Sequence, residues 1–202
     1  MVSENGAAQP DLRDRRRDSV RREIALHAVD LFERQGFAGT TVEQIAEATG
    51  VSLRTFYRHC PVKEEALTPL LAEGVDALVA ELARRPAGEP LTTAARAALL
   101  HSCRRSGSQT RRTARVMLGV PALKARWLAA GRRAQGLLAP LVAERTGTPA
   151  DALAPAVTAG LLINVATTAV EHWACGDESL TLESVTADAF AVVTGFGATG
   201  QD

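Results

Sequence analysis

The sequence predicts an all-α protein. Hydrophobic residues make up 46% of its 202 residues, and Ala and Leu dominate them. No segment alternates apolar and polar residues with the period of two that is typical of a strand, whereas apolar residues often recur three and four positions apart. Glycine and proline separate these periodic segments. We therefore expect a small N-terminal helical head and a larger helical body, about nine helices in all.

The first predicted helix covers RREIALHAVDLFERQGF, residues 21–37. Its apolar positions at helical spacing are Ile24, Ala25, Ala28, Leu31 and Phe32. Gly36 is a suitable C-terminal stop, and Phe37 supplies a hydrophobic contact after it. Residues 1–12, which precede the helix, are polar and are expected to be a disordered tail.

A dense basic segment connects this tail to the helix. Its arginines are Arg13, Arg15, Arg16, Arg17, Arg21 and Arg22. Asp14 and Asp18 partly neutralise the segment. Two interpretations stay open, a solvated helix start and a basic arm that lies on a phosphate backbone or reaches a minor groove.

Two short helices joined by a glycine turn are predicted in TTVEQIAEATGVSLRTFYRHCPVK, residues 40–63. Thr41 and Gln44 have the spacing of a capping box at the start of the first helix. Gly50 can adopt the left-handed conformation that ends it. Ser52 is a good N-cap for a second helix, Leu53 to His59, which Pro61 stops. The unit has the size of a helix-turn-helix.

The second helix carries side chains that suit DNA. Arginine can bridge guanine in the major groove and threonine can contact a base methyl group, whereas Tyr, His and Lys suit phosphates. A solvated amphipathic helix is the alternative. The predicted DNA-binding residues are Thr41, Ser52, Leu53, Arg54, Thr55, Tyr57, Arg58, His59 and Lys63, together with Arg16 and Arg17 of the basic segment.

Residues 20–67 resemble the N-terminal domain of TetR-family transcriptional regulators. The matching run is A-x-x-L-F-E-R-Q-G-F-x-G-T-T-V-E-Q-I-A-E-x-T-G-V-S-x-R-T-F-Y-R-H, followed by P-V-K-E-E-A-L. The resemblance covers about a quarter of the chain and is specific in order and spacing. It implies a DNA-binding domain at residues 13–63 and a ligand-binding and dimerisation domain at residues 64–202.

The body begins with a helix predicted from Lys63 to about Arg85, ended by Pro86. Pro69 falls within it and predicts a kink, which is either a hinge or a tolerated defect near the first turn. Further helices are predicted at residues 91–105, 109–118, 122–145, about 151–174 and 182–196.

Several apolar residues of the body have two possible roles. They are most simply core residues, but the resemblance implies that some line a ligand cavity. The candidate lining residues are Leu71, Val75, Leu100, Cys103, Met117, Trp127, Leu128 and Asn164. The arginines of RRSGSQTRRTAR, residues 104–115, either receive an anionic ligand or belong to a solvated turn.

Residues 152–170 carry no charge, which superficially suggests a membrane span. Pro155, Asn164, threonines and many alanines make the segment too weakly apolar, so no membrane association is expected. Its small residues, Ala159, Gly160, Ala166 and Ala169, suit close packing against another helix. The resemblance implies that the helices at 151–174 and 182–196 pair with those of a second copy in a four-helix dimer interface.

The neutral net charge hides a strong asymmetry. No Lys or Arg follows Arg145, and residues 146–202 have a net charge of −7, so the first 145 residues carry +7. A basic front and an acidic rear favour DNA as a partner.

The cysteines and histidines indicate no cofactor. Cys60, Cys103 and Cys175 are far apart, and the start of the chain lacks an apolar run, so reduced thiols in a bacterial-type cytoplasm are expected. His101 and Cys103 have no matching acid nearby, and no metal site or cofactor is expected.

The sequence favours one class of function over two others. The favoured one is a homodimeric repressor that a small-molecule effector releases from a palindromic operator in double-stranded DNA. An effector-independent architectural or adaptor protein that binds DNA is the alternative. An enzyme is not expected, because no nucleophile–base pair, metal spacing or phosphate loop is visible.

Overall fold

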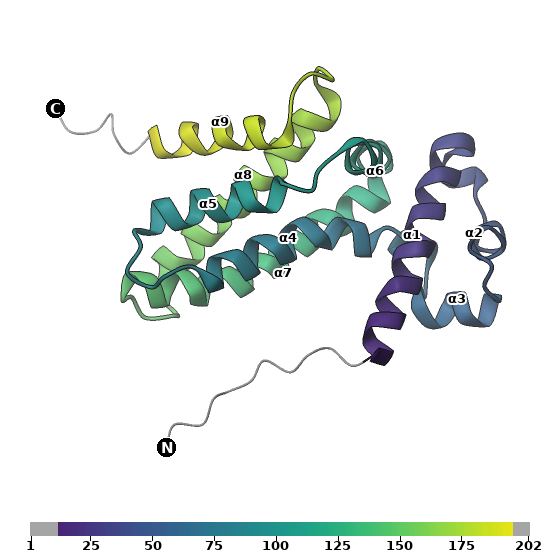
Figure 1. Ribbon diagram of the computed structural model, residues 1–202, viewed down its shortest axis with the longest axis horizontal. Coiled ribbons are helices and arrows are strands. Elements are labelled where there is room, and N and C mark those ends of the chain that lie inside the picture. The colour runs from purple at the N-terminus through teal and green to yellow at the C-terminus, as the bar shows by residue number, and fades with distance from the viewer. Residues whose placement is uncertain (1–11, 196–202) are drawn as a thin grey trace. The chain divides into compact units, whose positions relative to one another are not determined.

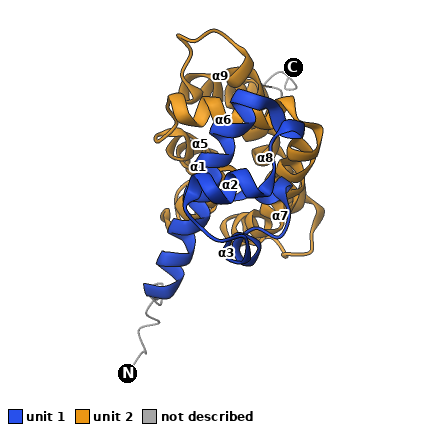
Figure 2. Ribbon diagram, turned by 90° about the vertical axis from the view of Figure 1, so that its right-hand side faces the viewer, with its two compact units in different colours: residues 1–69 blue, residues 70–202 orange. Residues whose placement is uncertain are grey.

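The computed structural model describes residues 12–195, and these residues form α-helices and a 3-10 turn without any strand (Figure 1). The predicted all-α class is confirmed. The chain divides into two compact units, residues 1–69 and residues 70–202 (Figure 2). The expected tail lies outside the described residues except for Leu12, and so does Phe196 at the expected end of the last helix.

The head contains α1 (Leu12–Gly39), α2 (Val42–Thr49), α3 (Leu53–His59) and the 3-10 turn Lys63–Glu65. Its buried apolar residues are Ile24, Ala25, Ala28, Val29, Phe32, Ile45, Ala46 and Phe56. They come from all three helices, because the helical spacing in each one places apolar side chains on a single face. The head is therefore built around one small core.

α1 begins earlier than the sequence predicted. The arginine-rich segment before Arg21 is helical from Leu12 onward, so it is neither an extended arm nor a loop. Arginine is a good helix former, and Asp14 in the first turn is favourable near the helix N-terminus. Near its other end Gly36 has a φ of 76°, which a residue with a side chain rarely adopts.

The body contains six helices. They are α4 (Thr68–Arg84), α5 (Leu91–Cys103), α6 (Ser108–Gly119), α7 (Pro121–Thr146), α8 (Leu153–Cys175) and α9 (Leu182–Gly195). Each corresponds to a helix predicted from the sequence, although most ends differ by one to several residues. The larger cluster of buried apolar residues draws on α4, α5, α7, α8 and α9.

Small residues let α7 and α8 pack closely. A Cβ atom added at Gly131 of α7 would lie 3.1 Å from Cγ2 of Ile163 in α8. Ala159 and Ala169, two of the small residues singled out in α8, are fully buried. The expected close packing of this helix is thus realised against α7 and α9 within the same chain.

Pro69 does not kink α4. The helix begins at Thr68, so Pro69 is its second residue. The backbone N–H groups of the first turn have no partner within a helix, and a proline there removes nothing. The kink predicted at this position is therefore wrong, because α4 starts five residues later than the sequence suggested.

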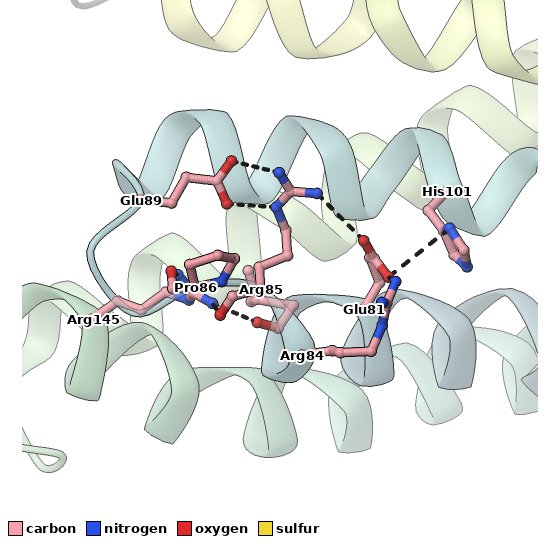
Figure 3. A network of polar contacts seen from close by, with 8 residues as sticks. Glu81, Arg84, Arg85, Pro86, Glu89, His101 and Arg145 are labelled. Atoms are coloured by element: carbon pink, nitrogen blue, oxygen red, sulfur yellow. Dashed lines mark hydrogen bonds and ion pairs between the residues drawn. The ribbon is translucent and has the colours of Figure 1, made fainter.

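A polar network fixes the end of α4 (Figure 3). Arg145 of α7 donates hydrogen bonds to the carbonyl oxygens of Leu82, Arg85 and Pro86 at 2.6–2.8 Å. These carbonyls have no partner inside the helix, so the guanidinium group of Arg145 acts as a C-terminal cap.

Glu81 is the buried carboxylate of the same network. It accepts hydrogen bonds from Arg84 and Arg85, and its Oε2 lies 3.9 Å from Nδ1 of His101 in α5. The hydrogen bond from Arg84 is the main reason that the pKa of Glu81 lies below its usual value. The network thus joins α4 to α5 and α7 through charged groups.

Among the described helices, α8 is long and apolar enough to cross a membrane by length and composition. A core helix of a soluble protein meets the same criterion. Ala159, Leu162 and Ile163 of α8 are buried in the larger cluster and Trp173 in a second one, so the fold already uses this helix as core.

Candidate nucleic-acid interface

Local interactions fix both ends of α2. The backbone N–H of Gln44 donates to Oγ1 of Thr41 at 3.3 Å, and the N–H of Thr41 donates to Oε1 of Gln44 at 2.9 Å. This is the predicted capping box. Gly50 ends α2 in the left-handed conformation, with a φ of 72°. The first residue of α2 and the point where the turn toward α3 begins are therefore set by residues that the sequence identifies.

α3 buries one side and presents the other. The N–H of Thr55 donates to Oγ of Ser52 at 3.2 Å, which caps the helix. Phe56 is fully buried, and the ring of Tyr57 meets it edge-on with the centroids 5.8 Å apart. The exposed residues of this helix are Leu53, Arg54, Tyr57 and Arg58. Four of the predicted DNA-contacting residues thus share an open surface, while the hydroxyl groups of Thr41 and Ser52 serve as caps.

Lys63 has structural partners that the sequence did not reveal. Its Nζ donates to the carbonyl oxygens of Phe37 and Thr40, both at 2.7 Å, and lies 4.2 Å from the centroid of the Phe37 ring. The ammonium group therefore ties the 3-10 turn Lys63–Glu65 to the joint between α1 and α2. One N–H of the ammonium remains for the predicted phosphate contact.

His59 lies at the C-terminal end of α3. Burial, followed by the positive charges of Arg58, Arg17 and Arg21, lowers the pKa of His59. Arg17 and Arg21 belong to α1, so the arginine-rich start of α1 lies near the end of α3. The structure thereby brings Arg17 together with the predicted residues of α3.

Two family models match the chain. Residues 24–68 match the model described as bacterial regulatory proteins, tetR family, and residues 86–196 match the MftR C-terminal domain model. The second match covers more than half of the 202 residues. The chain belongs to the TetR family. It is accordingly a DNA-binding transcriptional regulator, as its head geometry indicates.

Two transcriptional regulators are similar in sequence to this TetR-family chain. The chain is 40% identical over 152 residues to the HTH-type transcriptional regulator TcmR of Streptomyces glaucescens, covering 70% of this chain and 67% of TcmR. It is 31% identical over 182 residues to MftR of Mycobacterium tuberculosis, which is named for mycofactocin biosynthesis. That match covers 89% of this chain and 91% of MftR.

Solved TetR-family structures have the same fold. The SmeT–triclosan complex superimposes with a TM-score of 0.60 at 20% identity, covering 87% of this chain and 91% of SmeT. NalD of Pseudomonas aeruginosa, the secondary repressor of the MexAB-OprM efflux pump, gives a TM-score of 0.58 at 19% identity. The latter match covers 91% of this chain and 97% of NalD. At these identities the likeness concerns the fold.

The residues predicted to line a ligand pocket in this TetR-family body differ in how deeply they are buried. Cys103, Met117 and Trp127 are buried, whereas Leu128 and Asn164 are exposed. Leu71, Val75 and Leu100 are half-buried. The expectation that Leu128 is a core residue is wrong, because α7 turns this position outward. The pocket role of Leu128 and Asn164 stays a prediction.

Two hollows stand out in the described residues, and neither is lined by the predicted pocket residues. An open one of about 430 Å³ is lined by Thr168, Glu171, His172, Cys175 and Gly176. A smaller one of about 60 Å³ lies beside the α4 cap. No cluster of three or more His, Cys, Asp or Glu residues that could hold a metal ion occurs within residues 12–195.

Arg111 has a structural role that neither interpretation of residues 104–115 included. It is only 7% exposed and donates to the carbonyl oxygens of Asp177 and Leu180 at 3.1 and 2.7 Å. Its guanidinium group lies over the Trp173 ring, 4.7 Å from the centroid. Arg115, one turn later, donates to the carbonyl of Ala174 at 2.8 Å. α6 therefore clamps the loop between α8 and α9, and Arg111 is not free to receive an anion.

Replacing Arg111 by methionine is expected to lower the free energy of unfolding by about 2–4 kcal/mol, because two carbonyls lose charge-assisted hydrogen bonds at a buried site. The midpoint of urea denaturation measures this loss. Arg104→Met is the matched control, since Arg104 is exposed and its loss is expected to change stability by less than about 0.5 kcal/mol. Equal midpoints for the two variants would contradict the clamp.

Lys63→Met is expected to lower the free energy of unfolding by about 1–3 kcal/mol even without DNA, because the carbonyls of Phe37 and Thr40 each lose a charged donor. A side chain that contacted phosphate alone would leave the stability of the free protein unchanged. Thermal unfolding of the purified variant tests this, with Arg34→Met at an exposed position of α1 as the control.

Sequence reasoning missed the residues that support the interface from outside the motif. Gln35 of α1 donates through Nε2 to Oε1 of Gln44 at 2.8 Å and to Oγ1 of Thr40 at 3.2 Å. It fastens the capping box of α2 to α1. A polar residue directly before the glycine stop of a helix was the available signal, but it does not specify a partner nine residues away.

Proposed function

We propose that the chain is a homodimeric repressor that binds a palindromic operator through α3 and is released by a small-molecule effector. The observation that carries the proposal is the exposed surface of α3. Arg54 lies at the second position of this helix and is exposed. In helix-turn-helix proteins the N-terminal residues of the second helix meet the base edges, and arginine favours guanine there.

The remaining exposed residues of α3 suit the DNA backbone and the groove wall. Tyr57 and Arg58 lie further along the helix and can contact phosphates, which fixes the register of the head without reading sequence. Leu53 offers an apolar surface to a thymine methyl group. A base-reading end and a phosphate-binding end on one seven-residue helix support sequence-specific binding.

The exposed face of α8 supports a dimer. Its apolar side chains Leu153, Val157 and Leu161 are 78%, 50% and 44% exposed, and Val192 of the adjacent α9 is 60% exposed. The three positions on α8 are four residues apart and so form one stripe. Such a stripe on helices that already pack together matches the face of a four-helix interface with a second copy. We assign the interface to α8 and α9, close to residues 151–174 and 182–196.

A symmetric dimer determines the form of the operator. Two copies related by a twofold axis present two α3 helices in opposite directions, so the two half-sites must be inverted repeats. Their centres are expected about 10 base pairs apart or at a multiple of that distance. A cytoplasmic location follows from this role, because the operator is on the chromosome of a bacterial cell.

The effector-independent alternative is supported by the packing of the body. Leu99, Met117, Leu123 and Leu138 are essentially inaccessible to solvent, and neither of the two hollows described above is lined by a residue predicted for the pocket. An effector would have to enter by displacing some of these side chains. An adaptor or architectural protein needs no such space.

Selection of bound duplexes from a random library, followed by sequencing, tests the proposed DNA recognition. We expect a strongly enriched inverted repeat bound by two copies. The absence of any enriched motif would refute a sequence-specific regulator, and an unpaired half-site would refute the symmetric dimer.

Native mass spectrometry of the protein purified from its own host tests the effector. A small molecule retained by the dimer, which also lowers operator affinity when it is added back, supports the release mechanism. Protein that carries no ligand and whose operator affinity does not respond to host metabolite extracts supports the effector-independent alternative.

A further inference from the structure

The first three turns of α1 are unusually basic. The segment from Leu12 to Arg22 holds six arginines and two aspartates, for a net charge of +4, and it is helical throughout. Figures 1 and 2 both show the N-terminal part of α1 extending beyond α3. Arginines four positions apart on a helix repel one another, which disfavours the helix. These arginines are also not needed for the core, because its first residue is Ile24.

Three of these arginines continue the inner face of α1. Arg13, Arg17 and Arg21 are spaced four residues apart, and the next position in the series is the buried Ala25. Residues at this spacing lie above one another on a helix. The three arginines, which we term the arginine ridge, therefore continue the side of α1 that packs within the head.

The ridge lies close to α3. The charges of Arg17 and Arg21 are among the causes of the lowered pKa of His59, after burial and Arg58. His59 also has a buried Nδ1 that lacks a hydrogen-bond partner in the described structure. The positive charges of Arg58, Arg17 and Arg21, which come from two helices and act together at His59, favour an anion at the surface beside them.

We propose that the arginine ridge is a second DNA-contacting element of the head, which binds backbone phosphates beside the C-terminal end of α3, outside the base pairs that α3 reads. The inference rests on the proposed function, because it assumes that α3 enters the groove. It differs from a basic arm, since a rigid helix holds the arginines in one row.

A phosphate in this position interacts with several groups at once. The guanidinium groups of Arg17 and Arg21 are planar donors that match phosphate oxygens, and the imidazole of His59 can donate from a ring nitrogen. The contact adds affinity and orientation but no choice of sequence. Removing the contact is therefore expected to change the salt dependence of DNA binding and to leave the preferred DNA sequence unchanged.

The test compares two double variants of the full chain with equal loss of charge. Arg17→Gln/Arg21→Gln removes two ridge residues. Arg15→Gln/Arg34→Gln removes two exposed arginines of the same helix. Arg15 lies about 200° around the helix axis from Arg17, so it does not belong to the ridge. Dissociation constants are measured by fluorescence anisotropy from 50 to 300 mM KCl.

The ridge variant is expected to reduce the slope of log Kd against log salt by about 3–4 for a dimer, as four phosphate contacts are lost. The control variant is expected to change the slope by less than about 1. The ridge variant is also expected to gain less affinity than the parent when the operator duplex is lengthened by five base pairs at each end. Equal slopes for both double variants would overturn the proposal, because net charge would then explain the effect.

The selected sequence motif separates this inference from the proposed function. An unchanged motif with a reduced slope in the ridge variant supports the ridge. A changed motif would overturn it, because the arginines would then read bases. If the parent chain selects no motif at all, the proposed regulator fails, and the slopes on random duplexes still decide whether the ridge binds phosphates.

Discussion

Val157→Asp/Leu161→Asp is expected to convert the dimer into monomers and to weaken operator binding by about two to four orders of magnitude, because two linked heads gain that much from binding together. Both residues are exposed in the single chain, so aspartate at these positions leaves the core of each copy intact. In a dimer built on this face the aspartates are buried without partners. The desolvation cost is several kcal/mol for each charge.

Sedimentation velocity measures the oligomeric state of this variant, and anisotropy measures its affinity for a full palindrome and for one half-site. The expected pattern is a monomer whose half-site affinity equals that of the parent. Leu128→Asp/Ala129→Asp is the matched control, because both residues are exposed on α7 and lie outside α8 and α9. If the variant with aspartate at positions 157 and 161 stayed dimeric, the dimer interface would have to lie on another face of the body.

Arg54→Ala is expected to cost about 1–3 kcal/mol of operator binding and to relax the choice of one base pair in each half-site. The physical reason is that arginine donates two hydrogen bonds to a guanine, and alanine leaves that base edge unpaired in the groove. Arg54 is exposed at the start of α3, so the substitution does not disturb the head core.

Arg58→Ala serves as the comparison, since Arg58 is also exposed but lies near the C-terminal end of α3. Its loss is expected to weaken binding to operator DNA and to random DNA alike. It is also expected to reduce the slope of log Kd against log salt by about 1 per head. Repeating the duplex selection with both variants distinguishes the roles. A motif that is identical for the parent and Arg54→Ala would exclude base reading by Arg54.

Local interactions explain which parts of the head could be predicted. The capping box of Thr41 and Gln44 and the left-handed Gly50 each depend on residues at most four positions apart. The buried side of each helix follows from its apolar spacing in the same way. The prediction of a kink at Pro69 was wrong, because a proline in the sequence does not show whether it lies in the first turn or in the interior of a helix.

The assignments that failed in the body depend on helix rotation. Leu128 lies on α7, where apolar and charged residues are distributed around the helix and do not define an inner face. Arg111 was assigned to solvent or to a ligand because a lone arginine is seldom buried. Its carbonyl partners lie 66 and 69 residues further along the chain, and no local rule connects these positions.

The sequence by itself determined the all-α class, the helix-turn-helix and the residues available to meet DNA, because capping, glycine conformation and helical periodicity are properties of short segments. The tertiary structure alone decided that Lys63 braces the α1–α2 joint, that Arg111 clamps the α8–α9 loop and that Arg17 and Arg21 lie near enough to His59 for their charges to lower its pKa. These pairings join residues more than twenty positions apart. They exist because packed helices take one relative rotation, which no single helix specifies.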